Sequence, residues 1–171
     1  GAVFMNAGAY KSDMGYIVSE IKVLSPDLKV ITLYNKDLNY KYRDSFLRHN
    51  AGYICLEAKL VLRHGDKKLI KELMETRRQK RLLSQPLEYP SAGSVFRNPE
   101  NDFAGKLIED CGLKGYKIGG AEVSLKHANF IINTGKASAN DVMNLINYVH
   151  DKVKEKTNVD LKIEQEFVNW E

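Results

Sequence analysis

The residues with the clearest chemical potential lie in a short polar segment, residues 89–99, which reads YPSAGSVFRNP. Ser94 follows a glycine that lets the backbone approach a ligand closely, and Arg97 and Asn98 place a cation and an amide nearby. This combination suits the presentation of a hydroxyl proton donor to a polar, anionic ligand. Gly, Ser, Asn and Pro are also ordinary turn residues, so a plain surface turn is the alternative.

A second candidate is the charged and aromatic segment of residues 40–45, which reads YKYRDS. An arginine such as Arg43 can hold a carboxylate or a phosphate with two parallel hydrogen bonds. Tyr42 adds a phenol directly before this cation. The alternative is an exposed Arg43–Asp44 ion pair in a loop, with no ligand at all.

A third candidate is a loop of small residues near the start of the chain: Asn6, Ala7, Gly8, Ala9 and Tyr10. Small side chains leave backbone N–H groups accessible, and such groups can cradle a pyrophosphate or the polar edge of a flavin ring. Tight packing of a turn under a sheet explains the same composition. The G-x-G-x-x-G spacing of a dinucleotide fingerprint is absent, so a Rossmann site is excluded.

Two single residues carry weaker signals. Glu164 lies in an expected last strand, where a solvated carboxylate at an edge is the simpler reading. His127 is a lone histidine, which is more often structural than a ligand. The four histidines are far apart in sequence and lack paired acidic neighbours, so we expect no metal site.

The elements that must position these residues follow from periodicity. Two β-rich runs, residues 15–24 and 28–34, flank a turn signal, and residues 53–63 alternate as a half-buried strand does. A helix is expected from Asp66 to about Leu83, with a basic face that is better explained by solvent than by nucleic acid.

Prolines at positions 86 and 90 then break the pattern, so we expect two domains, residues 1–84 and 85–171. The second domain is expected to contain a helix capped by Asn101 or Asp102 and ending near Gly112, one or two strands within 123–133, a helix opened by a Ser138–Asp141 capping box, and a final strand over 159–168. The class is α+β.

Composition limits the function classes. The net charge of +4 is too mild for a dedicated nucleic-acid binder, and no apolar run is long enough to span a membrane. Cys55 and Cys111 lack metal-ligand spacing and are expected to be reduced thiols of a cytosolic protein. The chain opens as if inside a folded element, without an initiator methionine or a signal peptide, so we expect the C-terminal part of a longer protein.

Taken in order, several segments resemble the MurB family, the flavoenzymes known as UDP-N-acetylenolpyruvoylglucosamine reductases. The matching segments are residues 5–10, 42–45, 85–96, 104–109, 115–121 and 126–128. The match covers nearly the whole chain, and the short spacing between Arg43 and Ser94 is similar to the family type that lacks an extra tyrosine-bearing substrate loop.

The resemblance implies the distal half of a FAD-binding domain of the vanillyl-alcohol-oxidase/MurB type, followed by a substrate-binding domain. NADPH would reduce FAD, and the substrate UDP-N-acetylglucosamine enolpyruvate would be reduced to UDP-N-acetylmuramate, a peptidoglycan precursor. It further implies catalytic roles for Ser94, Arg43 and Glu164, and FAD contacts by the loop of residues 6–10. The residues implied to bind substrate are Tyr42, Asn98, Lys106, Tyr116 and His127.

Two departures from the family pattern leave alternatives open. The usual Glu-Val-Arg run reads Glu164-Gln165-Glu166, so Glu166 competes with Glu164 as the catalytic carboxylate. The first half of the flavin domain is not in this chain, so FAD binding by these residues alone is left open. The alternatives are a non-catalytic nucleotide-sugar-binding fragment or a flavin oxidoreductase of the same fold with another substrate. A cytoplasmic monomer without nucleic-acid or membrane partners is expected.

Overall fold

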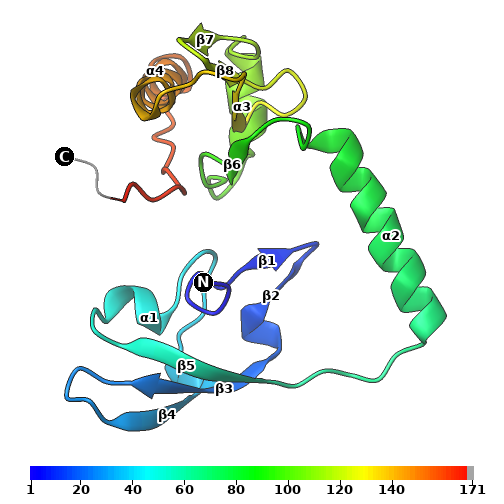
Figure 1. Cartoon of the computed structure of the whole chain (residues 1–171), viewed down its shortest axis with the longest axis vertical. Helices are drawn as coiled ribbons and strands as arrows, with labels where there is room; N and C mark the ends of the chain where they lie inside the picture. The colour runs from blue at the N-terminus through cyan, green and yellow to red at the C-terminus, as the bar shows by residue number, and fades with distance from the viewer. Residues whose placement is uncertain (169–171) are drawn as a thin grey trace. The chain divides into compact units, whose positions relative to one another are not determined.

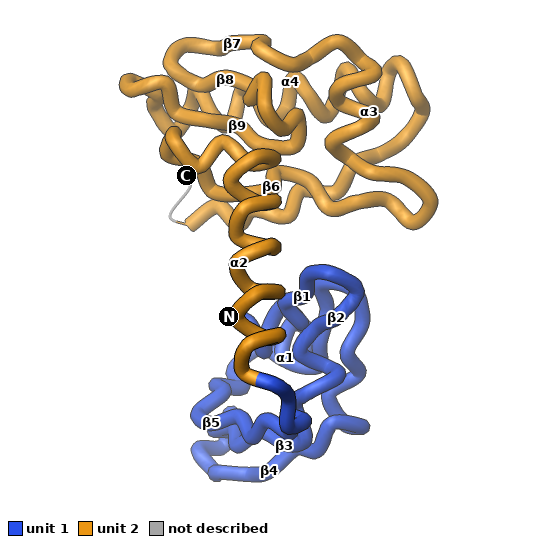
Figure 2. Tube along the Cα trace, turned by 90° about the vertical axis from the view of Figure 1, so that its right-hand side faces the viewer, with its two compact units in different colours: residues 1–66 blue, residues 67–171 orange. Residues whose placement is uncertain are grey.

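The chain folds into two compact units, residues 1–66 and 67–171 (Figure 2). The structure is a computed structural model that describes residues 1–168, and each unit is described by itself. The division falls ahead of a long helix, whereas the sequence places the domain boundary at the end of that helix. The boundary at residue 84 therefore stays a prediction.

The first unit is a three-stranded antiparallel sheet in the order β4-β3-β5 with a small hairpin before it (Figure 1). Its elements are β1 Gly8–Ala9, β2 Ser12–Asp13, the 3-10 helix η1 Met14–Tyr16, β3 Val18–Leu24, β4 Val30–Tyr34, the 3-10 helix η2 Asn35–Asp37, α1 Phe46–His49 and β5 Ile54–Leu60. The two predicted β-rich runs are thus confirmed as β3 and β4.

The core of this unit forms around the central strand. Val18, Ile21 and Val23 of β3 are buried together with Leu38 and Leu47. The prediction of a half-buried strand at residues 53–63 is wrong in its burial. The apolar side chains of β5 alternate as expected, but Ile54, Leu56 and Leu60 are 57%, 54% and 45% exposed, and only Ala58 packs against the core of this unit.

The second unit packs two helices with a four-stranded antiparallel sheet in the order β6-β9-β8-β7. Its elements are α2 Lys67–Ser84, β6 Ser91–Ser94, α3 Ala104–Asp110, β7 Lys117–Ile118, β8 Ala121–Val123, β9 Phe130–Asn133 and α4 Ala139–Thr157. The apolar stripe of α4 is buried, and α4 contacts α3 and the strands β7, β8 and β9. Every residue of α2 is exposed, and Figure 1 shows it as a single long helix.

The α+β class is confirmed, as are the long helices, while two local predictions are wrong. Asn101 and Asp102 do not cap α3; the Oδ1 atom of Asn98 accepts from the Ala104 N–H at 3.0 Å instead. Residues 159–168 form no strand, because only the bridge between Phe96 and Ile163 pairs this segment with the sheet.

Among the described residues, none of the helices combines the length and apolar character that crossing a bilayer requires.

The start of α4 confirms the predicted capping box. The Ser138 hydroxyl accepts from the Asp141 N–H at 3.1 Å, and the Asp141 carboxylate accepts from the Ser138 N–H at 2.9 Å and from the Gly120 N–H at 3.3 Å. These hydrogen bonds, the one from Ser138 first, lower the pKa of the Asp141 carboxyl below its usual value.

We expect this carboxylate to make the second unit sensitive to acid. A carboxyl with a lowered folded-state pKa stabilises the fold above its unfolded pKa of about 4, and this contribution is lost as the pH falls through the lowered value. Asp141→Asn keeps an acceptor but no charge, so it should lose less stability than the unchanged protein between pH 6 and pH 3. Urea unfolding at both pH values measures this, and equal losses in the two proteins would contradict it.

Candidate functional site

The structure brings Ser94 and Glu164 together although 70 residues separate them in sequence. Ser94 ends β6, and the Glu164 N–H donates to the carbonyl of the next residue, Val95, at 2.8 Å. One residue earlier, the Gly93 carbonyl accepts from the Gln165 side chain at 3.5 Å. The segment that carries Glu164 therefore lies against the strand that carries Ser94.

His127 lies at the same end of the sheet, in the loop between β8 and β9. Its ring packs against Phe130, with 4.8 Å between ring centroids, and Phe130 is the ladder partner of Ser94. The Nδ1 atom of His127 accepts from the Asn129 N–H at 3.2 Å, and burial is the main cause that lowers the pKa of His127. The neutral ring then carries its proton on Nε2, where it can donate to a ligand.

The first turn of α3 lies beside this histidine. A Cβ built on Gly105 would come within 3.3 Å of the His127 Cε1 atom, so glycine permits the close approach. The adjacent Lys106 forms exposed ion pairs with Asp110 at 3.1 Å and Asp102 at 3.5 Å, which raise its pKa, the hydrogen bond to Asp110 most. A phosphate ligand of Lys106 would compete with both carboxylates.

Asn98 is engaged by the fold itself. Its Oδ1 atom accepts from the Ala104 N–H at the start of α3, so the fold already uses one of its two acceptor positions. The neighbouring Arg97 has its Nε buried without a hydrogen-bond partner among the described residues. Its backbone N–H donates to the Lys162 carbonyl at 2.8 Å, which again joins this strand to the segment before Glu164.

Tyr116 lies away from Ser94 in this unit. It directly precedes β7, at the opposite edge of the sheet from β6, so three strand spacings, about 14 Å, separate the two edges. Its ring stacks on Tyr148 of α4, with 4.3 Å between centroids and 7° between planes. The structure therefore gives Tyr116 a packing partner rather than a place beside the hydroxyl.

In the first unit, Arg43 lies in a tight turn. Its φ of 54° is left-handed, its carbonyl accepts from Arg48 Nη1 at 2.8 Å, and Lys41 and Asp44 bridge the turn. The guanidinium lies over the ring of Tyr42, 5.0 Å from the centroid, and that ring is 54% exposed. The pair thus presents a cation and an aromatic face at the surface of the unit.

The small-residue loop is tied to this turn. Asn6 is 2% exposed; its Nδ2 donates to the Lys41 carbonyl at 2.9 Å, and its Oδ1 accepts from the Gly15 N–H at 2.8 Å. Next to it, Gly8–Ala9 pairs with Ser12–Asp13 through a two-residue turn, in which Tyr10 and Lys11 both have positive φ. Residues 6–10 and Arg43 therefore belong to one hydrogen-bonded framework.

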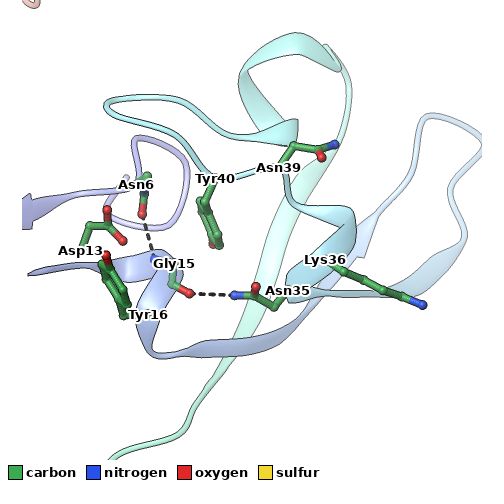
Figure 3. Close-up of a pocket in the computed structure, with 8 residues that line it drawn as sticks. All are labelled: Asn6, Asp13, Gly15, Tyr16, Asn35, Lys36, Asn39 and Tyr40. Atoms are coloured by element: carbon green, nitrogen blue, oxygen red, sulfur yellow. Dashed lines mark hydrogen bonds between the residues drawn. The ribbon is translucent and has the colours of Figure 1, made fainter. Parts of the chain in front are cut away.

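A pocket of about 390 Å³ opens beside this framework (Figure 3). Asn6 is the only residue of the predicted flavin loop among those that line it: Asn6, Asp13, Gly15, Tyr16, Asn35, Lys36, Asn39 and Tyr40. The hydroxyl of Tyr40 is buried and has no hydrogen-bond partner among the described residues. Burial, followed by the charges of Cys55 and Asp13, raises the pKa of Tyr40 to about 12.

Sequence reasoning included Tyr40 in the candidate segment of residues 40–45 without giving it a role of its own, and it missed Asn129. Tyr40 is one of nine tyrosines, and no spacing distinguishes it from its neighbours. Asn129 is a single amide at the start of a strand, and only the fold shows that its side chain bonds to the strand after Ser94. No group of three or more acidic, histidine or cysteine side chains that could hold a metal occurs within residues 1–168.

The family model and the most similar relatives that were found carry the same family name. Residues 85–168 match the family described as UDP-N-acetylenolpyruvoylglucosamine reductase, C-terminal domain. The chain is 49% identical over 168 residues to the UDP-N-acetylenolpyruvoylglucosamine reductase of Caldanaerobacter subterraneus, covering 98% of this chain and 55% of that protein. It is 48% identical over 171 residues to the same-named protein of Clostridium novyi, covering 100% and 55%.

A solved structure agrees. The chain is similar to the UDP-N-acetylenolpyruvylglucosamine reductase (MurB) of Thermus caldophilus, with a TM-score of 0.84 and 36% sequence identity, over 97% of this chain and 58% of that one. The chain thus spans little more than half the length of the relatives it matches.

Proposed function

We propose that this chain, which belongs to the UDP-N-acetylenolpyruvoylglucosamine reductase family, supplies the substrate-reducing part of such an enzyme. The substrate would be UDP-N-acetylglucosamine enolpyruvate, and the product UDP-N-acetylmuramate for peptidoglycan synthesis. The observation that carries this proposal is the backbone pairing that places Glu164 beside the Ser94 strand.

The reaction adds a hydride and a proton across a carbon–carbon double bond. Bound FAD, reduced by NADPH, would supply the hydride to one carbon. Arg43 would hold the substrate carboxylate, into which the developing negative charge delocalises, and Ser94 Oγ would give its proton to the neighbouring carbon. Glu164 is proposed as the catalytic carboxylate beside Ser94; its backbone bond to Val95 favours it over Glu166.

The remaining residues around Ser94 suit an anionic ligand. The Nε2 proton of neutral His127 can donate to a diphosphate oxygen, and Lys106 offers a positive charge on the adjacent helix turn. We propose these two as the diphosphate contacts of this unit, with Asn98 holding the helix that carries Lys106 through its Oδ1. Tyr42 would contact substrate beside Arg43, whereas Tyr116 is better explained by its stacking.

The residues proposed to hold a flavin in the first unit lie around Asn6 and the pocket beside it. The buried Tyr40 hydroxyl lacks a partner among the described residues, and it lines the same pocket as Asn6. A polar flavin edge could supply the missing hydrogen bond, while residues 7–10 continue from Asn6 into the β1–β2 hairpin, whose backbone is partly used by its own hydrogen bonds. Because relatives are nearly twice as long, we propose that the residues preceding the matched region in those relatives correspond to the rest of the flavin site.

A non-catalytic nucleotide-sugar-binding protein is the second candidate, and the partial coverage of relatives favours it for this chain alone. The test is an anaerobic absorbance titration of the full-length protein that contains this chain. We expect NADPH to bleach its flavin bands and the enolpyruvyl substrate to restore them. Bleaching without restoration would reject the substrate, and a colourless protein that binds UDP-N-acetylglucosamine in calorimetry would support the second candidate.

A further inference from the structure

One buried amide connects both halves of the Ser94–Glu164 pair. Asn129, which directly precedes β9, is 4% exposed. Its Oδ1 accepts from the Phe96 N–H at 2.9 Å, and its Nδ2 donates to the Phe96 carbonyl at 2.8 Å. Its side chain therefore makes the two hydrogen bonds that a neighbouring strand would otherwise make.

The Asn129 side chain is needed because the regular backbone pairing between β6 and β9 ends at Ser94. β6 pairs with β9 at Ser91–Ile132 and Ser94–Phe130, so three residue steps on β6 meet two on β9. The extra residue forms a bulge that includes Gly93, whose φ is 79°. Beyond it, the backbone of Val95 donates to the Asn129 carbonyl, and the Asn129 side chain then holds Phe96.

The opposite edge of residues 95–97, which follow β6, holds the glutamate segment. The Val95 carbonyl accepts from the Glu164 N–H, and the Arg97 N–H donates to the Lys162 carbonyl, both at 2.8 Å. Phe96 itself is 1% exposed, so water cannot replace the amide of Asn129 at its backbone. A displacement at Phe96 would therefore move the segment of residues 95–97, which directly follows Ser94 and pairs with the segment of Glu164.

We propose that Asn129 is a positioning residue, which fixes the proton-donating hydroxyl of Ser94 and the Glu164 segment in one arrangement. It acts through the backbone of residues 95–97. This inference rests on the proposed function for its catalytic consequence, while its structural part stands on the hydrogen bonds alone.

The test uses Asn129→Leu, which removes both side-chain hydrogen bonds at similar volume, in the full-length flavoenzyme. The matched control is Asn133→Leu at the other end of β9, because the Asn133 Oδ1 also accepts two backbone bonds, from Gly135 and Ala137, far along the strand from Ser94. We expect reduction of the flavin by NADPH to be unchanged in both variants. Reoxidation by the enolpyruvyl substrate should slow about 100-fold in Asn129→Leu only, with little change in KM.

Backbone hydrogen exchange gives a readout that does not depend on activity. The amides of Arg97 and Glu164 should exchange at least about tenfold faster in Asn129→Leu and as before in Asn133→Leu. If Asn129→Leu does not fold, Asn129→Asp keeps the volume and one acceptor but loses the donor to the Phe96 carbonyl, and the same two results are expected.

Three outcomes would overturn the inference: unchanged exchange at both amides, equal slowing of the two flavin steps, or the same slowing in Asn133→Leu. A wild-type enzyme whose flavin the substrate never reoxidises would instead reject the proposed function. The exchange rates would then still decide whether Asn129 holds the two segments together.

Discussion

Ser94→Ala is expected to separate the two halves of the proposed reaction. Flavin reduction by NADPH should proceed within about twofold of the normal rate, because the hydroxyl takes no part in that step. Reoxidation of the flavin by the enolpyruvyl substrate should slow by about 1,000-fold or more, since positioned proton transfer contributes about 10²–10⁴-fold to such reactions. Stopped-flow absorbance of the two steps measures both effects in one preparation.

The structure offers a control on the same strand. Ser91 begins β6 and Ser94 ends it, so Ser91→Ala makes the same chemical change with a comparable effect on the strand. Ser91→Ala should leave both steps unchanged. If Ser94→Ala slowed the two steps equally, the hydroxyl would not be the proton donor, and the loss would point to disturbed flavin binding.

The long helices could be predicted from sequence because their signals are local. Ser138, Asp141 and the apolar stripe that begins at Val142 lie within a few turns, and each is visible without knowing what packs against it. The hairpin strands β3 and β4 are similarly close in sequence. The order of elements, and with it the α+β class, followed from these local signals.

The arrangement around Ser94 could not be predicted in the same way, since it depends on pairing between distant backbones. Glu164 comes close to Ser94 through the single bridge between Phe96 and Ile163, not through a strand with its own alternating pattern. Asn98 caps α3 from six residues before Ala104, a spacing that no capping rule anticipates. The exposed face of β5 shows a related limit, because alternation identifies an apolar face but not whether another element covers it.

Gly120→Ala is expected to be among the most damaging single-methyl additions in the second unit. A Cβ at this position would lie 2.3 Å from the Ala137 backbone nitrogen and 2.5 Å from the Lys136 carbonyl carbon, so backbone rather than a flexible side chain blocks it. The same glycine donates to Asp141 and accepts from Thr134, and these bonds fix the β7–β8 turn against the start of α4. Relief of the clash would have to break one of these contacts.

Such overpacking against fixed backbone should cost about 4 kcal/mol, at the upper end of the usual range for single substitutions. For a unit of this size that corresponds to a fall in Tm of about 15 °C or more. Gly105→Ala is the matched comparison, because its Cβ would meet side chains alone, the His127 ring at 3.3 Å and the Asn129 Cβ at 3.6 Å, and the change adds helix propensity to α3. Thermal unfolding should therefore show a large fall in Tm for Gly120→Ala and almost none for Gly105→Ala. Similar Tm values for the two variants would contradict this prediction. They would mean that the segment before α4 moves more easily than its hydrogen bonds to Gly120 imply.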